Sequence, residues 1–328
     1  MKKVLITGVS GFVGSHLADY LLSLGDVEVY GTIRHRSPMD NILHIQDKIK
    51  LWEGDITDAS SVDKLLKEIN PDKIFHLAAQ SFVPYSWTAP SETMRVNVFG
   101  ALNILETVRK SLQDCIVLLV GTSEEYGLVY QEEIPIKETN PLRPLSIYGV
   151  SKVAQEELGY VYYKSYGVKT ILTRGFNHFC HRRGAEFVES KIAKQAAEIY
   201  LGKRSQFSLG NLETVRDFTD ARDIVRCYWL LSEELSKGNT DVLATPFNLC
   251  SGIGLTIKEI LYKISNILNV PPNVEQDINF LRPKNADVPI LIGDCSKAEK
   301  IIGRVSTISI DNSLLELVNY WKLKLIGL

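Results

Sequence analysis

The first half of the chain alternates short apolar segments with longer segments of helical periodicity. Apolar runs rich in β-branched residues predict buried parallel strands at residues 4–7, 27–31, 49–52, 73–81, 115–120 and 168–173. Apolar residues at helical spacing predict helices between these strands, at residues 16–22, 60–69, 91–109 and 146–166. This order of elements predicts an α/β fold built on a doubly wound parallel sheet.

Beyond residue 173 the predicted elements become shorter and more mixed. They are helices at residues 187–201 and 256–268, a strand at residues 247–252, an extended stretch at residues 282–292 and a closing helix. We therefore expect one domain in residues 1–173, to which later segments around residues 211–250 return. A smaller, interwoven C-terminal domain is expected in residues 174–328.

Composition narrows the class of protein. The 328 residues are 45% hydrophobic and 23% charged, which is typical of a globular chain. A formal net charge of -2 gives no reason to expect nucleic acid or an anionic membrane surface as a partner. The N-terminal lysines precede an apolar run that Gly8 and Gly11 interrupt, so we read a strand rather than a signal peptide or membrane anchor. Five scattered cysteines without ligand spacing indicate reduced thiols and a cytoplasmic protein.

A glycine motif follows the first predicted strand directly. Residues 8–14 read Gly-Val-Ser-Gly-Phe-Val-Gly, a GxxGxxG pattern between a strand and a helix. Small residues let such a turn close and let a pyrophosphate approach the backbone at the helix N-terminus. We therefore interpret residues 1–173 as a dinucleotide-binding Rossmann domain, with cofactor contacts from Gly8, Gly11, Phe12, Val13 and Gly14.

The residues after the second strand indicate which dinucleotide is bound. An NAD-binding chain usually offers Asp or Glu to the adenosine ribose at this point, but here the first acid is Asp40. Arg34 and Arg36 stand where a 2′-phosphate would lie, which favours NADP over NAD. The alternative is a basic loop in contact with solvent.

The ends of the third and fourth strands offer further cofactor contacts. An acid after the third strand is placed to accept a hydrogen bond from the adenine amino group, and the small residues after the fourth strand allow close passage of the cofactor. Asn97, on the following helix, is expected to hold neighbouring backbone rather than take part in chemistry. The predicted cofactor contacts in these two segments are Asp55, Ile56, Leu77, Ala78 and Ala79.

Two segments bring the chemically reactive residues together. Thr122, Ser123 and Glu124 follow the fifth strand, and the carboxyl ends of strands are where open α/β sheets bind ligands. Tyr148 and Lys152 are four residues apart on a predicted helix and so share one face. An ammonium beside a phenol favours the phenolate, which is a usable base. The alternative is a buried tyrosine and an unrelated surface lysine.

Several motifs occur in one order along the whole chain: TGxxGxxG, HLAAQS, the serine/threonine strand end, YxxxK and RxFN. In this the chain resembles the extended short-chain dehydrogenase/reductase family of nucleotide-sugar enzymes. Two branches of that family compete. The TSE-x-YG pattern at residues 122–127 and the FNH…RRG loop at residues 176–184 resemble GDP-mannose 4,6-dehydratases, whereas RDFTD at residues 216–220 and residues 81–87 resemble GDP-4-keto-6-deoxy-mannose reductases.

The resemblance implies a role for each reactive residue. Tyr148 would take the C4 hydroxyl proton, Lys152 would lower the pKa of Tyr148 and hold the nicotinamide ribose, and Thr122 would bind the C4 oxygen. Glu124 would remove the C5 proton, and it or Ser123 would protonate the departing hydroxyl. Since a reductase does not need Glu124, we favour a GDP-sugar 4,6-dehydratase with tightly bound NADP that moves a hydride from C4 to C6. The sugar would be GDP-mannose or a GDP-manno-heptose.

Two other functions stay open at this point: an NADPH-dependent reductase, and a non-catalytic NADP-binding scaffold on the same fold. The resemblance also implies a homodimer or homotetramer and assigns His178 to the cofactor. His76, His178 and His181 lack metal-ligand spacing, so no metal is expected. Arg182 and Arg183, with Arg216 and Arg282, are candidates for holding the substrate diphosphate. The full set of predicted substrate contacts is Ser81, Asn177, Val188, Lys191, Arg216 and Arg282.

Overall fold

The computed structural model describes residues 1–281 and 288–327, so the predicted contact Arg282 lies outside the described residues. A seven-stranded sheet forms its centre, in the order β10-β6-β5-β4-β1-β2-β3, and every pairing in it is parallel. The strands are β1 (Lys2–Thr7), β2 (Val27–Ile33), β3 (Lys50–Glu53), β4 (Lys73–His76), β5 (Ile116–Thr122), β6 (Lys169–Gly175) and β10 (Pro246–Leu249).

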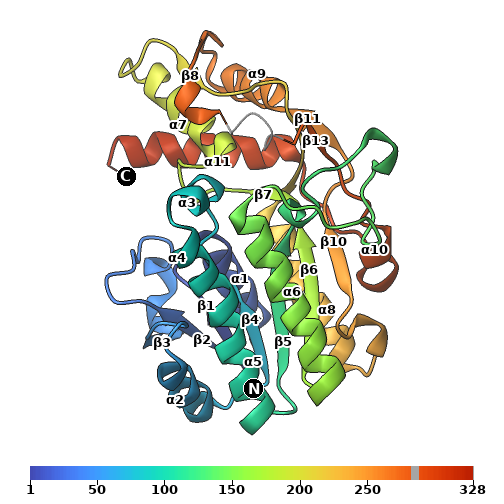
Figure 1. The fold of residues 1–328 in the computed structure, drawn as a ribbon. Helices are drawn as coiled ribbons and strands as arrows, with labels where there is room; N and C mark the ends of the chain where they lie inside the picture. Colours follow the sequence, from blue (N-terminus) through green and yellow to red (C-terminus); the bar gives the residue numbers. More distant parts are fainter. Residues whose placement is uncertain (282–287, 328) are drawn as a thin grey trace.

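Helices cover both faces of this sheet (Figure 1), because its strands are apolar on both sides. One apolar core lies between the sheet and the helices α1 (Phe12–Leu24), α8 (Ala221–Ser236) and α10 (Ser296–Ile302). A second core lies on the other face, under α2 (Ala59–Ile69), α5 (Gly100–Ser111) and α6 (Ile147–Tyr166). The predicted α/β doubly wound fold is confirmed.

A smaller helical layer sits beyond the carboxyl end of the sheet, at the top of Figure 1. Its core joins α7 (Val188–Tyr200), α9 (Ile257–Leu268) and α11 (Ile310–Leu325). Short strands accompany these helices. One small sheet consists of β7 (Asn177–Phe179), β9 (Val215–Asp220), β11 (Gly254–Thr256) and β13 (Ile290–Leu291), and in a second one β8 (Phe207–Leu209) pairs with β12 (Val274–Gln276). From the segment 211–250, α8 and β10 return to the large sheet.

The segment after β4 differs from the prediction. The strand ends at His76 rather than at residue 81, and a short helix α3 (Val83–Thr88) follows. The predicted helix 91–109 consists of α4 (Pro90–Met94), a π-helical turn at Arg95–Phe99 and α5. Asn97 lies in that turn, and its side chain accepts from the Gln80 N–H (2.8 Å) and donates to the Gln80 carbonyl (3.0 Å). The predicted backbone-holding role of Asn97 is confirmed.

Short 3-10 turns complete the described elements, at Leu43–Lys48, Ser123–Glu125, Gln131–Glu133, Thr240–Val242 and Ile278–Phe280. Among the helices of residues 1–281 and 288–327, none combines the length and the apolar character needed to span a bilayer.

Candidate active site

The end of β5 carries the first three candidate residues. Thr122 is the last extended residue, and its hydroxyl accepts from the Glu124 N–H (3.3 Å), which starts the 3-10 turn Ser123–Glu125. The Thr122 N–H donates to the Glu125 carboxyl (2.6 Å), so the turn closes as a capping box. Ser123 is buried, whereas Thr122 and Glu124 are half-buried at the carboxyl end of the sheet.

Helix α6 brings Tyr148 and Lys152 to the same place. Its N-terminus is capped by Ser146, whose hydroxyl accepts from the Gly149 N–H (3.0 Å). Gly149 lets the helix pack closely on the turn, since a Cβ there would lie 2.7 Å from the Glu124 carbonyl oxygen. Tyr148 and Lys152 are one helical turn apart and both buried, and the Thr122 hydroxyl bonds to the Tyr148 phenol. The expected meeting of the strand end with the helical pair is therefore present.

The electrostatics of the pair differ from the expectation. Lys152 Nζ donates to the Val120 carbonyl (2.7 Å) and to Gln155 Oε1 (3.1 Å), and burial lowers its pKa to about 8. Burial raises the pKa of the Tyr148 phenol, which the Thr122 hydroxyl only partly offsets. The lowered tyrosine pKa that the sequence suggested is thus not present in this structure.

The glycine turn has the shape that a pyrophosphate requires. Gly8 has φ +72, and a Cβ on Gly14 would lie 2.4 Å from the Gly8 carbonyl oxygen, so larger residues would open the turn. Helix α1 begins after Gly11 without a side-chain cap, which leaves its first N–H groups directed to this turn. Thr7 holds β4 close by, because its hydroxyl accepts from the N–H groups of Leu77 (3.1 Å) and Ala78 (3.0 Å).

The loop after β2 forms the wall of an open pocket of about 420 Å³. Three predicted cofactor contacts meet there: Arg34, Arg36 and Asp55. Arg36 is held in the left-handed region (φ 63), and Asp55 is oriented by bonds from the Thr57 N–H and hydroxyl (both 2.8 Å). The pocket is lined by Arg34, His35, Arg36, Ser37, Pro38, Glu53, Gly54 and Asp55.

His178 and Asn177 lie on β7, where the chain leaves the large sheet. The His178 ring stacks on Phe12 of the glycine turn (centroids 6.3 Å apart), and its Nδ1 bonds to the Phe176 carbonyl (2.8 Å). Burial lowers the pKa of His178 to about 4, so it is neutral. His178 therefore lies beside the predicted pyrophosphate site.

The two arginines of the loop after β7, Arg182 and Arg183, contact different helices. Arg183 lies over the Phe187 ring (3.5 Å to the centroid) and pairs with Glu189 (3.0 Å), and its charge lowers the pKa of Tyr148. Arg182 instead turns back to α1 and pairs with Asp19 (2.6 Å). This pair holds Arg182 against α1, and the assignment of Arg182 to the substrate stays a prediction.

The remaining predicted substrate contacts are spread over the smaller layer. Val188 is the first residue of α7, and Lys191 on that helix lies over the Phe280 ring (3.2 Å to the centroid). Arg216 is buried on β9 and donates to the Val215 carbonyl (2.9 Å), whereas Ser81 is exposed after β4. Their assignment to the substrate stays a prediction.

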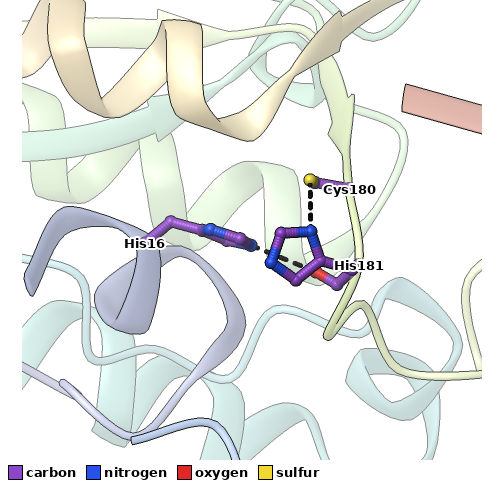
Figure 2. A group of neighbouring side chains, drawn as sticks. All are labelled: His16, Cys180 and His181. Carbon is purple, nitrogen blue, oxygen red and sulfur yellow. Dashed lines mark hydrogen bonds between the residues drawn. The ribbon is translucent and has the colours of Figure 1, made fainter. Parts of the chain in front are cut away.

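His16, Cys180 and His181 form a cluster that sequence spacing could not reveal (Figure 2), since 164 residues separate the first two. His16 Nε2 bonds to the His181 carbonyl (3.1 Å), and Cys180 Sγ bonds to His181 Nδ1 (3.0 Å). Burial and then the charges of Arg182 and Arg222 lower the pKa of His181, and those two charges would repel a cation. We therefore interpret the cluster as a packed contact between α1 and the loop after β7.

A glycine turn, a parallel sheet and a Tyr148–Lys152 pair beside the end of β5 define a dinucleotide-dependent enzyme of the extended short-chain dehydrogenase/reductase class. The model of the GDP-mannose 4,6 dehydratase family matches residues 5–317, and the chain belongs to this family. It is 35% identical to the GDP-mannose 4,6-dehydratase of Yersinia enterocolitica, with 97% of this chain and 93% of that relative covered. The enzyme of that name from Homo sapiens is 33% identical, with 96% and 90% covered.

Solved structures agree with the fold. The structure of RMD from Pseudomonas aeruginosa complexed with NADPH matches with a TM-score of 0.83 at 25% identity, covering 99% of this chain and 98% of that one. The dTDP-glucose 4,6-dehydratase of Bacillus anthracis, in complex with NAD, matches with a TM-score of 0.84 at 21% identity. At that identity the second likeness shows the fold alone.

Proposed function

We propose that this protein is a GDP-sugar 4,6-dehydratase that uses tightly bound NADP. The single observation that carries the proposal is Glu124, a half-buried carboxylate that follows Thr122 at the end of β5, opposite the N-terminus of α6. Dehydration needs a base at C5, and simple reduction does not. The names of the curated relatives support the same reaction.

Each active-site residue has a separate role in the proposed reaction. As a phenolate, Tyr148 would remove the proton of the C4 hydroxyl, and Thr122 would hold the C4 oxygen. Burial opposes the phenolate, whereas the Thr122 hydroxyl and the positive charge of Arg183 favour it. Once C4 is a ketone the C5 proton is acidic, and Glu124 removes it. The proton that leaves with the C6 hydroxyl as water comes from Glu124 or from Ser123. Lys152 holds the nicotinamide ribose and keeps positive charge near Tyr148.

NADP supplies the hydride acceptor and donor, so no net oxidation occurs. The chain fits it at two places on this structure: the uncapped N-terminus of α1 beside Gly8 suits the pyrophosphate, and Arg34 and Arg36 suit the 2′-phosphate. The NADPH bound to the Pseudomonas aeruginosa protein supports this choice over NAD.

The reductase is the second candidate, because of the RDFTD segment on β9 and the likeness to the NADPH complex of RMD. A reductase consumes NADPH when it is given a 4-keto sugar nucleotide, whereas a dehydratase shows no net cofactor turnover. A scaffold would bind NADP and catalyse neither reaction. NADPH absorbance with a 4-keto sugar nucleotide identifies the reductase, and mass spectrometry of the product formed from GDP-mannose separates the dehydratase from the scaffold.

The assembly and the compartment are also proposed. An apolar surface lies between α4 and α6, with Phe99 (55% exposed), Met94, Ile147 and Val150, and it suits a second copy of the chain in a homodimer or homotetramer. The five cysteines carry free thiols, which suits the cytoplasm. Light scattering of the purified protein measures the assembly directly.

A further inference from the structure

Glu125 occupies the variable position of the TSE-x-YG segment, and no role is assigned to it above. Its side chain is completely buried. Strand register explains why. Gly121 on β5 lies opposite Arg174 on β6, and a Cβ on Gly121 would lie 2.3 Å from Glu125 Oε1. Because Gly121 has no side chain, there is space for the Glu125 carboxyl over the paired ends of β5 and β6, two central strands of the sheet.

Four buried charged groups meet in this space: Lys152, Glu156, Arg174 and Glu125. The Arg174 guanidinium holds the Glu156 carboxylate with two bonds (2.9 and 2.6 Å) and lies 3.8 Å from Glu125. Glu156 is one helical turn beyond Lys152 on α6, so one helix supplies a cation and an anion to the cluster. Two positive and two negative groups balance when all are ionised.

Glu125 touches the catalytic segment through one strong contact. Its Oε1 accepts from the Thr122 N–H (2.6 Å), while Oε2 has no hydrogen-bond donor among residues 1–281 and 288–327. The same capping box directs the Thr122 hydroxyl toward the Glu124 N–H (3.3 Å), on the side where Tyr148 lies. Glu125 thus sits behind the residues that face the substrate.

We propose that Glu125 is a positioning residue of the active site: from behind the end of β5 it fixes Thr122 and supplies a negative charge to the buried cluster that contains Lys152. This rests on the proposed function only in that Thr122 and Lys152 take part in catalysis. It does not depend on whether the enzyme dehydrates or reduces its sugar.

Electrostatics support the second part of this role. Burial lowers the pKa of Lys152 to about 8, and the negative charge of Glu125 opposes that change. Burial and the neighbouring Glu156 carboxylate raise the pKa of Glu125 itself, and the charge of Arg174, the bond from the Thr122 N–H and the charge of Lys152 oppose that rise. The titratable groups that face Lys152 and Glu125 are His76 from β4, Tyr126 after the 3-10 turn, Tyr148 and Glu156 from α6, and Arg174 from β6.

The test compares Glu125→Gln and Glu125→Leu with the wild type. Gln keeps an oxygen for the Thr122 N–H but carries no charge, so Lys152 loses its proton at lower pH. We expect the alkaline limb of the kcat profile of Glu125→Gln to move down by about one pH unit, with KM nearly unchanged. Leu removes the contact as well, and we expect kcat to fall about tenfold or more at pH 7 and the amides of residues 122–126 to exchange faster.

Glu157→Gln is the matched control, because Glu157 is exposed on α6 next to Glu156 and its substitution changes the net charge equally. An alkaline limb of Glu125→Gln that coincides with those of the wild type and the control overturns the proposal. If Glu125→Leu does not fold, the Glu125→Gln profile decides alone.

Failure of the proposed function is a separate result. If the wild type makes no dehydrated product, the same profiles are taken on reduction of a 4-keto sugar nucleotide with NADPH. If neither reaction occurs, amide exchange decides: rates at residues 122–126 in Glu125→Leu equal to the wild type overturn the positioning role.

Discussion

Gly149 on α6 and Glu124 on the turn after β5 approach so closely that a Cβ on Gly149 would lie 2.7 Å from the Glu124 carbonyl oxygen. This contact limits how far apart the two halves of the active site lie, since Glu124 belongs to the turn after β5 and Tyr148 to α6. The chemistry therefore depends on a residue that has no reactive group.

Gly149→Ala tests this dependence. The added methyl group meets a backbone atom that cannot rotate away, so α6 must shift from the turn, and we expect kcat to fall about tenfold or more. Gly159→Ala is the comparison, because its Cβ would meet only the side chains of Leu119 and Leu172, both at 2.7 Å, away from the site. That variant should lose stability and keep its kcat. Equal kcat values for the two variants would contradict the account.

The pH dependence of turnover follows from Lys152. Its pKa is lowered to about 8 by burial, and the protonated form is the one that supports Tyr148. Protonated Lys152 predominates below this value, so kcat should be sustained near pH 7 and fall as pH rises through about 8. Lys152→Arg keeps its proton at every pH in this range, and its weaker activity should lack the alkaline fall. A wild-type profile that stays flat to about pH 10 would refute this assignment.

Arg34→Ala tests the choice of cofactor. The guanidinium lines the open pocket beside Asp55, where a 2′-phosphate would gain a charge-assisted contact that NAD does not offer. We expect the Kd for NADP to rise about tenfold, a change of about 1.4 kcal/mol, while the Kd for NAD changes little. Isothermal titration calorimetry with both dinucleotides measures the two Kd values. An equal rise in Kd for NADP and NAD would show that Arg34 does not contact the 2′-phosphate.

Asn97→Ala tests the support beneath the site. The Asn97 side chain makes bonds to the Gln80 N–H, the Gln80 carbonyl and Ser151 Oγ (2.9 Å), and its removal breaks all three. Ser151 Oγ keeps its bond to the Tyr148 carbonyl (2.7 Å), so the two Gln80 backbone groups are the ones left without this partner, and we expect a loss of about 2–4 kcal/mol in the free energy of unfolding. Asn103→Ala removes one bond, to the Ile56 carbonyl (2.9 Å), and should cost about 1 kcal/mol. Urea unfolding of both variants gives the comparison.

Much of the fold and part of the site follow from local patterns. The order of strands and helices gave the parallel sheet, and the glycine turn at Gly8 has the close contacts that its spacing required. Tyr148 and Lys152 share a face because helical geometry fixes their relation. These features depend on residues near one another in the chain.

Other features depend on contacts that no local pattern carries. Glu125 is adjacent to Glu124, and from its place in the sequence it resembles a second surface acid. In the fold its carboxyl is buried beside Arg174, which lies 49 residues further along the chain. Burial of the Tyr148 phenol likewise depends on packing from several elements. This burial raises the pKa of Tyr148, whereas the sequence led us to expect a lowered pKa. The segment after His76 is likewise held by a residue distant in sequence, because Asn97 makes two bonds to the backbone of Gln80.

The most direct test of the proposed function is product analysis by mass spectrometry after incubation of the NADP-loaded protein with GDP-mannose. We expect a product that has lost one water, formed without net change in NADPH. Glu124→Gln should bind the nucleotide sugar but form no dehydrated product, and Tyr148→Phe should slow turnover by a factor of about 10²–10⁴. Unchanged GDP-mannose with the wild type, together with NADPH consumption on a 4-keto sugar nucleotide, would contradict the dehydratase and establish the reductase.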